Sequence, residues 1–226
     1  MPIGIVSLNL IAPFLLFSAI LVFFSWRKGR SKFLRDFTGF LFGIAGASTC
    51  WAIGAWLISI DPKIAGYFHP LAGLSGGIGF LYFCHLALTF ITPERKWRIL
   101  GPLVFLFLIT NPILWLKPPI PSFSPEGVVL WNIDFLPGFT LFITGILFTG
   151  LPVIAFVYLG AKSTERFIKL RSFLISLGII LYMGGGLAHN IVTIPKQYLF
   201  SDIFTFLGVA LLLGAVYLKK ILKRIK

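Results

Sequence analysis

The sequence has few charged side chains, and acidic residues are especially scarce. Charged residues make up 12% of its 226 positions, against roughly 25% in an average soluble domain, while 58% are hydrophobic. Its seven Asp and Glu residues form no paired carboxylates and no acidic metal cluster, and a Gly-rich phosphate-binding loop is also absent. We therefore expect this chain not to be an enzyme.

Cysteine is equally scarce. The only two, Cys50 and Cys84, fall inside apolar stretches. A disulfide framework or a metal site needs more ligands than two lone cysteines supply. Both are therefore expected to serve in packing.

What the sequence has in abundance is long apolar runs. A hydrocarbon core about 30 Å thick needs about 20 such residues in a helix. The runs predict an all-α integral membrane protein, a bundle of seven transmembrane helices that forms one domain over residues 1–226. The expected spans are about 4–25, 37–60, 71–91, 99–116, 136–160, 172–193 and 202–218.

The basic residues are distributed very unevenly over the connecting segments. Of the 20 Lys and Arg residues, all but Lys63, Lys117 and Lys196 fall in alternate loops or in the C-terminal tail. Short loops rich in Lys and Arg stay in the cytoplasm. This predicts an external N-terminus, a cytoplasmic C-terminus and a multi-pass protein of the prokaryotic cytoplasmic membrane. The net charge of +13 is then a topology signal, and no nucleic acid is expected as a partner.

Three further patterns bear on packing. Small residues mark expected helix contacts at Gly39 to Gly46, Gly73 to Gly77 and Gly184 to Gly186. The long connection 117–135 opens with prolines, and its apolar second half is expected to fold back over the mouth of the bundle. Residues 218–225 repeat apolar side chains at helical spacing, so the last span is expected to continue as an amphipathic helix, either lying on anionic lipid or leading to an output domain.

Polar residues near the outer ends of the spans are the candidate site. Intramembrane polar groups are costly and often functional. Counting ~1.5 Å per helical residue places Asn111, His189 and Asn190 within ~3 Å of one depth. The same outer region holds the other candidates for lining a pocket: Trp131, Asp134, Trp56 and Ser75. The alternative is that the three residues only cap and cross-link helix ends.

The remaining polar residues suggest a catalytic and a cofactor interpretation, and the spacing argues against both. The segment Gly73-Leu-Ser75-Gly with Ala188-His189 resembles the serine and histidine motifs of rhomboid intramembrane proteases, but the interval between them is too long and the His-x-x-x-Asn helix is absent. His85 and His189 differ by ~15 Å in depth, too far for one haem. His85 is instead expected to be a buried, neutral residue that is hydrogen-bonded to a neighbouring helix.

The order of motifs along the whole chain is similar to one known family. Trp51-Ala-Ile-Gly54 is followed by the segment Gly79 to Phe90, which ends in His85-Leu-Ala-Leu-Thr-Phe, then by Thr110-Asn-Pro112, the basic loop 166–171 and His189-Asn190. This series resembles the seven-helix N-terminal sensor region of bacterial histidine kinases. The resemblance implies signal reception and not catalysis, through an output domain that family members usually carry after the last helix.

These observations lead to a sensor-like domain with a shallow outward-facing pocket, acting through a separate or removed kinase-like output partner. The alternative is a small structural or accessory subunit of a larger respiratory or photosynthetic membrane complex, and an intramembrane serine protease is the remote alternative. The expected partners are membrane lipids and either the output protein or other membrane subunits. No metal or cofactor is expected, although lipid could bind.

Overall fold

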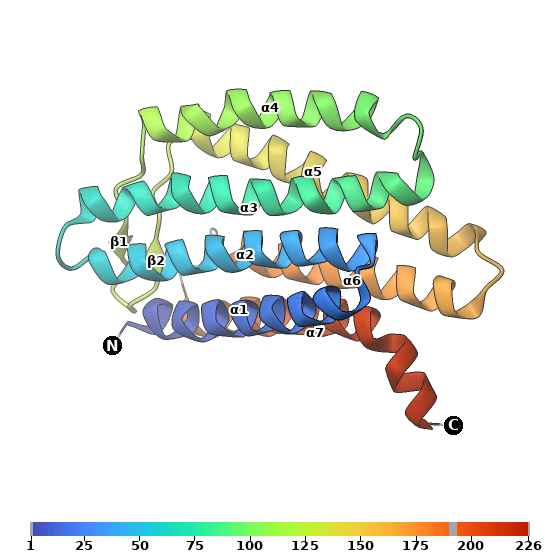
Figure 1. Ribbon diagram of the computed structural model, residues 1–226. Coiled ribbons are helices and arrows are strands. Elements are labelled where there is room, and N and C mark those ends of the chain that lie inside the picture. Colours follow the sequence, from blue (N-terminus) through green and yellow to red (C-terminus); the bar gives the residue numbers. More distant parts are fainter. Residues whose placement is uncertain (1, 190–193, 226) are drawn as a thin grey trace.

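The computed structural model describes residues 2–189 and 194–225, and within them the chain is built from seven long helices (Figure 1). Each is long and apolar enough to cross a membrane, so the expected all-helical, multi-pass architecture is confirmed. The helices are α1 (Ile3–Gly29), α2 (Lys32–Leu57), α3 (Pro62–Ile91), α4 (Lys96–Leu116), α5 (Phe135–Lys162), α6 (Arg166–Ala188) and α7 (Pro195–Ile225).

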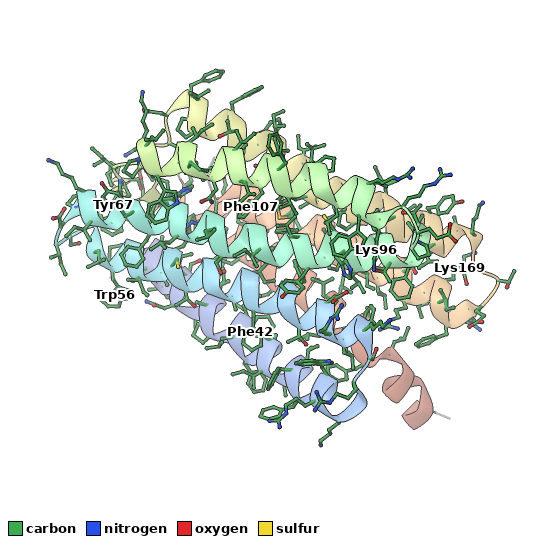
Figure 2. All side chains as sticks on the ribbon, turned by 45° about the horizontal axis from the view of Figure 1, so that its top comes forward. Phe42, Trp56, Tyr67, Lys96, Phe107 and Lys169 are labelled. Atoms are coloured by element: carbon green, nitrogen blue, oxygen red, sulfur yellow. The ribbon has the colours of Figure 1, made fainter. Side chains whose placement is uncertain are left out.

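Six of the helices close into a ring. Consecutive contacts join α1 to α2, α2 to α3, α3 to α5, α5 to α6, α6 to α7 and α7 back to α1, while α4 packs outside against α3 and α5. The N-terminus lies at one end of the bundle and the C-terminus at the other (Figure 1). Trp56 and Tyr67 lie toward the first end, and Lys96 and Lys169 toward the second (Figure 2).

Close packing between α2 and α3 depends on glycine. A Cβ atom at Gly43 would collide with the backbone of Gly79, and one at Gly39 would lie 2.6 Å from the ring of Tyr82. Two apolar helices in lipid gain stability mainly from such close approach. The expected small-residue contacts are therefore found here and at Gly185 against α7, whereas a Cβ at Gly184 would meet nothing within 4 Å.

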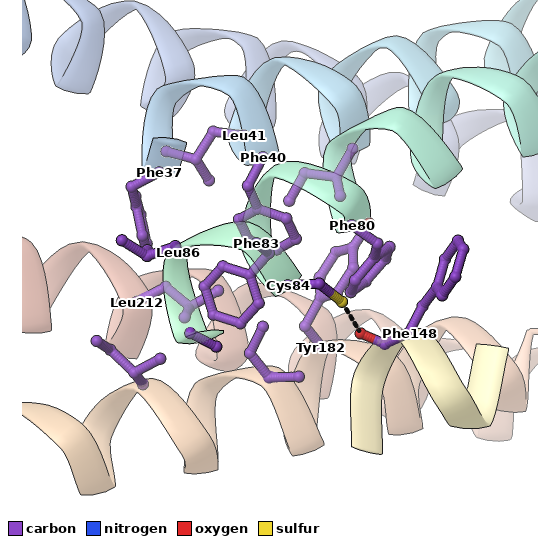
Figure 3. Close-up of a cluster of buried hydrophobic side chains, with 14 of the residues drawn as sticks. Phe37, Phe40, Leu41, Phe80, Phe83, Cys84, Leu86, Phe148, Tyr182 and Leu212 are labelled. Atoms are coloured by element: carbon purple, nitrogen blue, oxygen red, sulfur yellow. Dashed lines mark hydrogen bonds between the residues drawn. The ribbon is translucent and has the colours of Figure 1, made fainter. Parts of the chain in front are cut away.

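The centre of the bundle is a cluster of aromatic and aliphatic side chains (Figure 3). Phe37, Phe40 and Phe83 are fully buried in it, with the rings of Phe40 and Phe83 centred 4.6 Å apart. Cys84 is also buried, and its thiol donates to the carbonyl of Phe148 at 3.4 Å. Both cysteines are free, as expected of residues that serve in packing.

The connection between α4 and α5 forms a small antiparallel hairpin that the sequence pattern did not predict. Its strands are β1 (Ser122–Phe123) and β2 (Val129–Leu130). The apolar half does fold back onto the bundle, as expected: Val128 and Val129 are buried, and the carbonyl of Gly127 accepts from the amide of Gly4 at 3.2 Å. We call this end of the molecule the hairpin end and the opposite one the basic end.

Two helices begin well before their expected spans. α3 begins at Pro62 and not near residue 71, because the Asp61 carboxylate caps its first turn by accepting from the amides of Lys63 and Ile64. α7 begins at Pro195 and not near residue 202, and it runs without interruption to Ile225. The expected continuation of the last span as a helix is thereby confirmed.

Candidate functional site

A cavity of about 410 Å³ occupies the hairpin end of the bundle. Its wall takes side chains from all seven helices and from the segment that follows β2, and it is mostly aliphatic and aromatic. Phe142 of α5 and Leu187 of α6 belong to the wall yet are 52% and 44% exposed. The cavity therefore reaches the side of the bundle between α5 and α6.

Three of the predicted site residues meet at this cavity. Asn111 comes from α4, Trp131 from the segment after β2 and His189 from the end of α6. The Asn111 side chain is oriented by its own helix, since its Oδ1 atom accepts from the indole of Trp115 at 3.1 Å. Counting depth along the helices placed Asn111 and His189 at one level, because the depth of a residue in a continuous helix follows from its position in the sequence.

His189 also belongs to a polar chain that joins three helices. Its Nε2 atom lies 3.0 Å from Oδ1 of Asp202 on α7, close enough for an ion pair but without the alignment of a hydrogen bond. Ser7 of α1 donates to the same Asp202 oxygen at 2.7 Å. The ring of Tyr198 packs edge-on against His189, with centroids 4.2 Å apart. His189 therefore lines the cavity and cross-links helices at the same time.

The order of groups in this chain differs from that of a catalytic triad. A triad places the histidine between the hydroxyl and the carboxylate, so that the imidazole can take the hydroxyl proton. Here the carboxylate of Asp202 lies between Ser7 and His189. The arrangement holds α1, α6 and α7 together.

Three predicted residues lie away from the cavity. Trp56 is 50% exposed and donates to Asn9 at 3.2 Å, which links α2 to α1. The hydroxyl of Ser75 donates to the Gly43 carbonyl at 2.9 Å and so belongs to the α2–α3 contact. Asp134 is exposed, 3.8 Å from Lys117. The seventh candidate, Asn190, lies outside the described residues.

Two residues that the sequence did not single out for the site are prominent in it. His69 of α3 is 4% exposed, and its ring lies between those of Trp51 and Trp131, with centroid distances of 6.3 and 5.3 Å. All three line the cavity. The His69 Nδ1 atom and the Trp51 Nε1 atom are buried without a hydrogen-bond partner in the described structure. In the sequence, Trp51 stands only as the first residue of a motif of the resemblance, and His69 only as a histidine just before the expected start of a span.

A second polar cluster lies toward the basic end, outside the cavity. Asp36, which directly precedes the expected span 37–60, lies in the second turn of α2 and is 1% exposed. Its Oδ1 atom accepts from Nε of Arg35 at 2.7 Å, and its other oxygen faces His85 of α3. The described residues contain no group of three His, Cys, Asp or Glu side chains placed to hold a metal ion.

The fold and the cavity define a multi-pass helical membrane protein with a largely apolar internal site. In comparisons with family models, curated proteins and solved structures, no match was found.

Proposed function

We propose that this chain is a membrane-embedded sensor domain that binds a small molecule in the cavity at the hairpin end. The observation that carries the proposal is that one cavity is lined together by Asn111, Trp131 and His189. Its volume of about 410 Å³ lies within the range of roughly 300–1,000 Å³ that ligand pockets occupy. The resemblance of the motif order to the sensor regions of histidine kinases supports the same function.

The contacts of the cavity offer a route from ligand to output. Its wall includes Tyr182 and His189 of α6 and Tyr198 and Thr205 of α7. A ligand that fits one arrangement of these helices better than another shifts the population toward it. Because α7 is one helix from Pro195 to Ile225, a shift at the cavity is carried directly to the basic end.

The orientation follows from the basic residues. With the Lys- and Arg-rich loops in the cytoplasm, the hairpin end faces outward in the prokaryotic cytoplasmic membrane, and α7 leads inward. The output partner is then a kinase-like cytoplasmic protein or domain. The ligand meets the site from the outside or from the outer half of the membrane.

Filling the cavity tests the proposal. A Cβ atom at Gly145, which lines the cavity, has nothing within 4 Å, and the same is true of Gly150, which lies on the same helix but not on the cavity. Native mass spectrometry of the purified protein should find a bound small molecule in the wild type and in Gly150→Phe, and none in Gly145→Phe. The bound form should also show slower amide exchange in α7 around Tyr198 to Thr205.

The competing function is an accessory subunit of a larger membrane complex. That function predicts that other membrane subunits are present in fixed stoichiometry in the purified complex. It also predicts that filling the cavity changes neither a bound small molecule nor the amide exchange of α7. Finding no small molecule in the wild type, together with such subunits, would refute the sensor proposal.

A further inference from the structure

We infer that the ligand is an uncharged, largely apolar molecule with a carbonyl oxygen, held by Trp51 and His69 at the hairpin end of the cavity. This inference rests on the proposed function and adds the chemical class of the ligand and the residues that recognise it. It is carried by the composition of the cavity wall and by two buried nitrogen atoms.

The wall excludes a charged ligand. Among the described residues that line the cavity, none is Asp, Glu, Lys or Arg. A charge moved from water into an apolar site without an opposite charge costs many kcal/mol. Asp202 and its partner Ser7 do not line the cavity, and Asp202 is already in contact with both Ser7 and His189. A neutral molecule is therefore the occupant that the site favours.

The route to the cavity also favours an apolar molecule. The wall reaches the surface beside Phe142 and Leu187, two exposed side chains within apolar helices. In a membrane this flank of the bundle faces lipid. A molecule dissolved in the bilayer can then enter sideways between α5 and α6.

Four buried nitrogen atoms of the described wall have no hydrogen-bond partner, two of them on His189. The His189 ring already lies against Asp202, so the nitrogen atoms of Trp51 and His69 define the polar part of the ligand. A tryptophan Nε1–H can only donate, so its partner must be an acceptor. His69 Nδ1 donates in one of the two neutral tautomers. A buried polar group without a partner costs about 1–3 kcal/mol, and such groups in native structures call for an explanation such as a bound molecule.

A carbonyl oxygen matches this pair of donors. It has two lone pairs and no hydrogen of its own that would need a further acceptor. The rings of Trp51 and His69 are centred 6.3 Å apart, compatible with two N–H groups each about 2.9 Å from a shared oxygen. Both nitrogen atoms are covered by neighbouring atoms in the structure, so both rings must turn to reach a ligand. The torsion about the Cβ–Cγ bond of histidine and tryptophan has a broad energy well, so modest rotations can aim the two N–H groups at one oxygen.

Benzophenone and diphenylmethane provide a matched pair of probes, because they differ only in the carbonyl group. Wild-type protein in detergent should bind benzophenone about tenfold more tightly than diphenylmethane, the factor for about one buried hydrogen bond. Irradiated benzophenone inserts into nearby C–H bonds, and the labelled peptides should be those that contain Trp51, His69 or Trp131. His69→Phe should reduce this difference in affinity, and the double variant Trp51→Phe/His69→Phe should bind the two probes equally. Tyr67→Phe, exposed on the same helix and off the cavity, should behave as the wild type.

The possible results separate the two proposals. If the wild type binds both probes with equal affinity and Gly145→Phe binds neither, the carbonyl inference is overturned and the binding cavity stands. Failure of the wild type to bind either probe or to retain any small molecule would overturn the proposed function as well. If His69→Phe does not fold, as judged by its melting temperature, Trp51→Phe replaces it, and unchanged discrimination in that variant would equally refute the inference.

Discussion

The Nδ1 atom of His85 on α3 lies 2.7 Å from the Oδ2 atom of Asp36 on α2. The two residues join the most closely packed pair of helices, and Asp36 also accepts from Arg35. The His85 ring is flanked by Trp97 of α4, with centroids 5.5 Å apart. The expected hydrogen bond from His85 to a neighbouring helix is confirmed, but the residue is only partly buried and not fully buried as expected, because it lies near the basic end of the bundle. Its partner is an acid that directly precedes the expected span 37–60.

The first prediction concerns this pair. His85→Phe should lower the free energy of unfolding by about 1.5–3 kcal/mol, the range for a hydrogen bond to a charged group. The loss should stay in this range because Asp36 keeps its contact with Arg35. Denaturant unfolding of the detergent-solubilised protein would measure it.

A double-mutant cycle with Asp36→Asn serves as the control. Two residues in direct contact should show a coupling energy of about 0.5–3 kcal/mol. Strict additivity of the two substitutions would show that the contact contributes nothing to stability. Loss of a cofactor's absorbance in a folded His85→Phe protein would instead assign His85 as a ligand.

The second prediction concerns the contact between α2 and α3. Gly43→Ala should destabilise the protein by about 1–3 kcal/mol, the usual cost of overpacking, because the new methyl group meets the Gly79 backbone. Gly150→Ala is the matched control, since nothing lies within 4 Å of its new Cβ and alanine favours a helix by up to about 1 kcal/mol. Thermal melting of the two variants should shift in opposite directions, and a neutral Gly43→Ala would argue against this packing.

The sequence predicted the seven helices because their signal is one-dimensional. Length, hydropathy and the scarcity of charge decide whether a segment can span a membrane, and all three are visible along the chain. Depth is nearly one-dimensional as well, because each residue adds ~1.5 Å along a helix. That is why Asn111 and His189, which are far apart in sequence, could be assigned to one level and now line one cavity.

The direction that a side chain faces around its helix was not predictable in the same way. Trp56 and Ser75 share the hairpin end with the cavity but face other helices. His69 faces inward from a turn placed before the expected start of its span. Asp36 follows a run of basic residues and directly precedes the expected span 37–60, although the structure buries it. Nothing in a hydropathy profile distinguishes these positions.

The third prediction concerns the link between α1 and α7. Ser7→Ala removes the hydroxyl that donates to Asp202 and should cost about 1.5–3 kcal/mol, because the acceptor is a buried carboxylate. Ser18→Ala is the matched control: Ser18 is also buried in α1, but it donates only to the Phe14 carbonyl of its own helix. Amide exchange near Asp202 should accelerate in Ser7→Ala alone, and equal effects of the two variants would show that the link does not hold α7.

The fourth prediction concerns orientation, which rests on the basic residues alone. Ser124 in the hairpin is buried, and its hydroxyl accepts from the Val128 amide, so a cysteine there would react poorly on either side of the membrane. Glu126 is the better position because it is exposed at the turn, and Glu165 is its exposed counterpart between α5 and α6.

The labelling experiment uses a background in which Cys50 and Cys84 are replaced by alanine. In intact cells, a membrane-impermeant thiol reagent should label Glu126→Cys at once and Glu165→Cys only after the membrane is permeabilised. This result follows if the Lys- and Arg-rich loops lie in the cytoplasm. The reverse pattern would invert the molecule, placing the cavity on the cytoplasmic side and the end of α7 outside, and no cytoplasmic partner could then receive a signal through that helix.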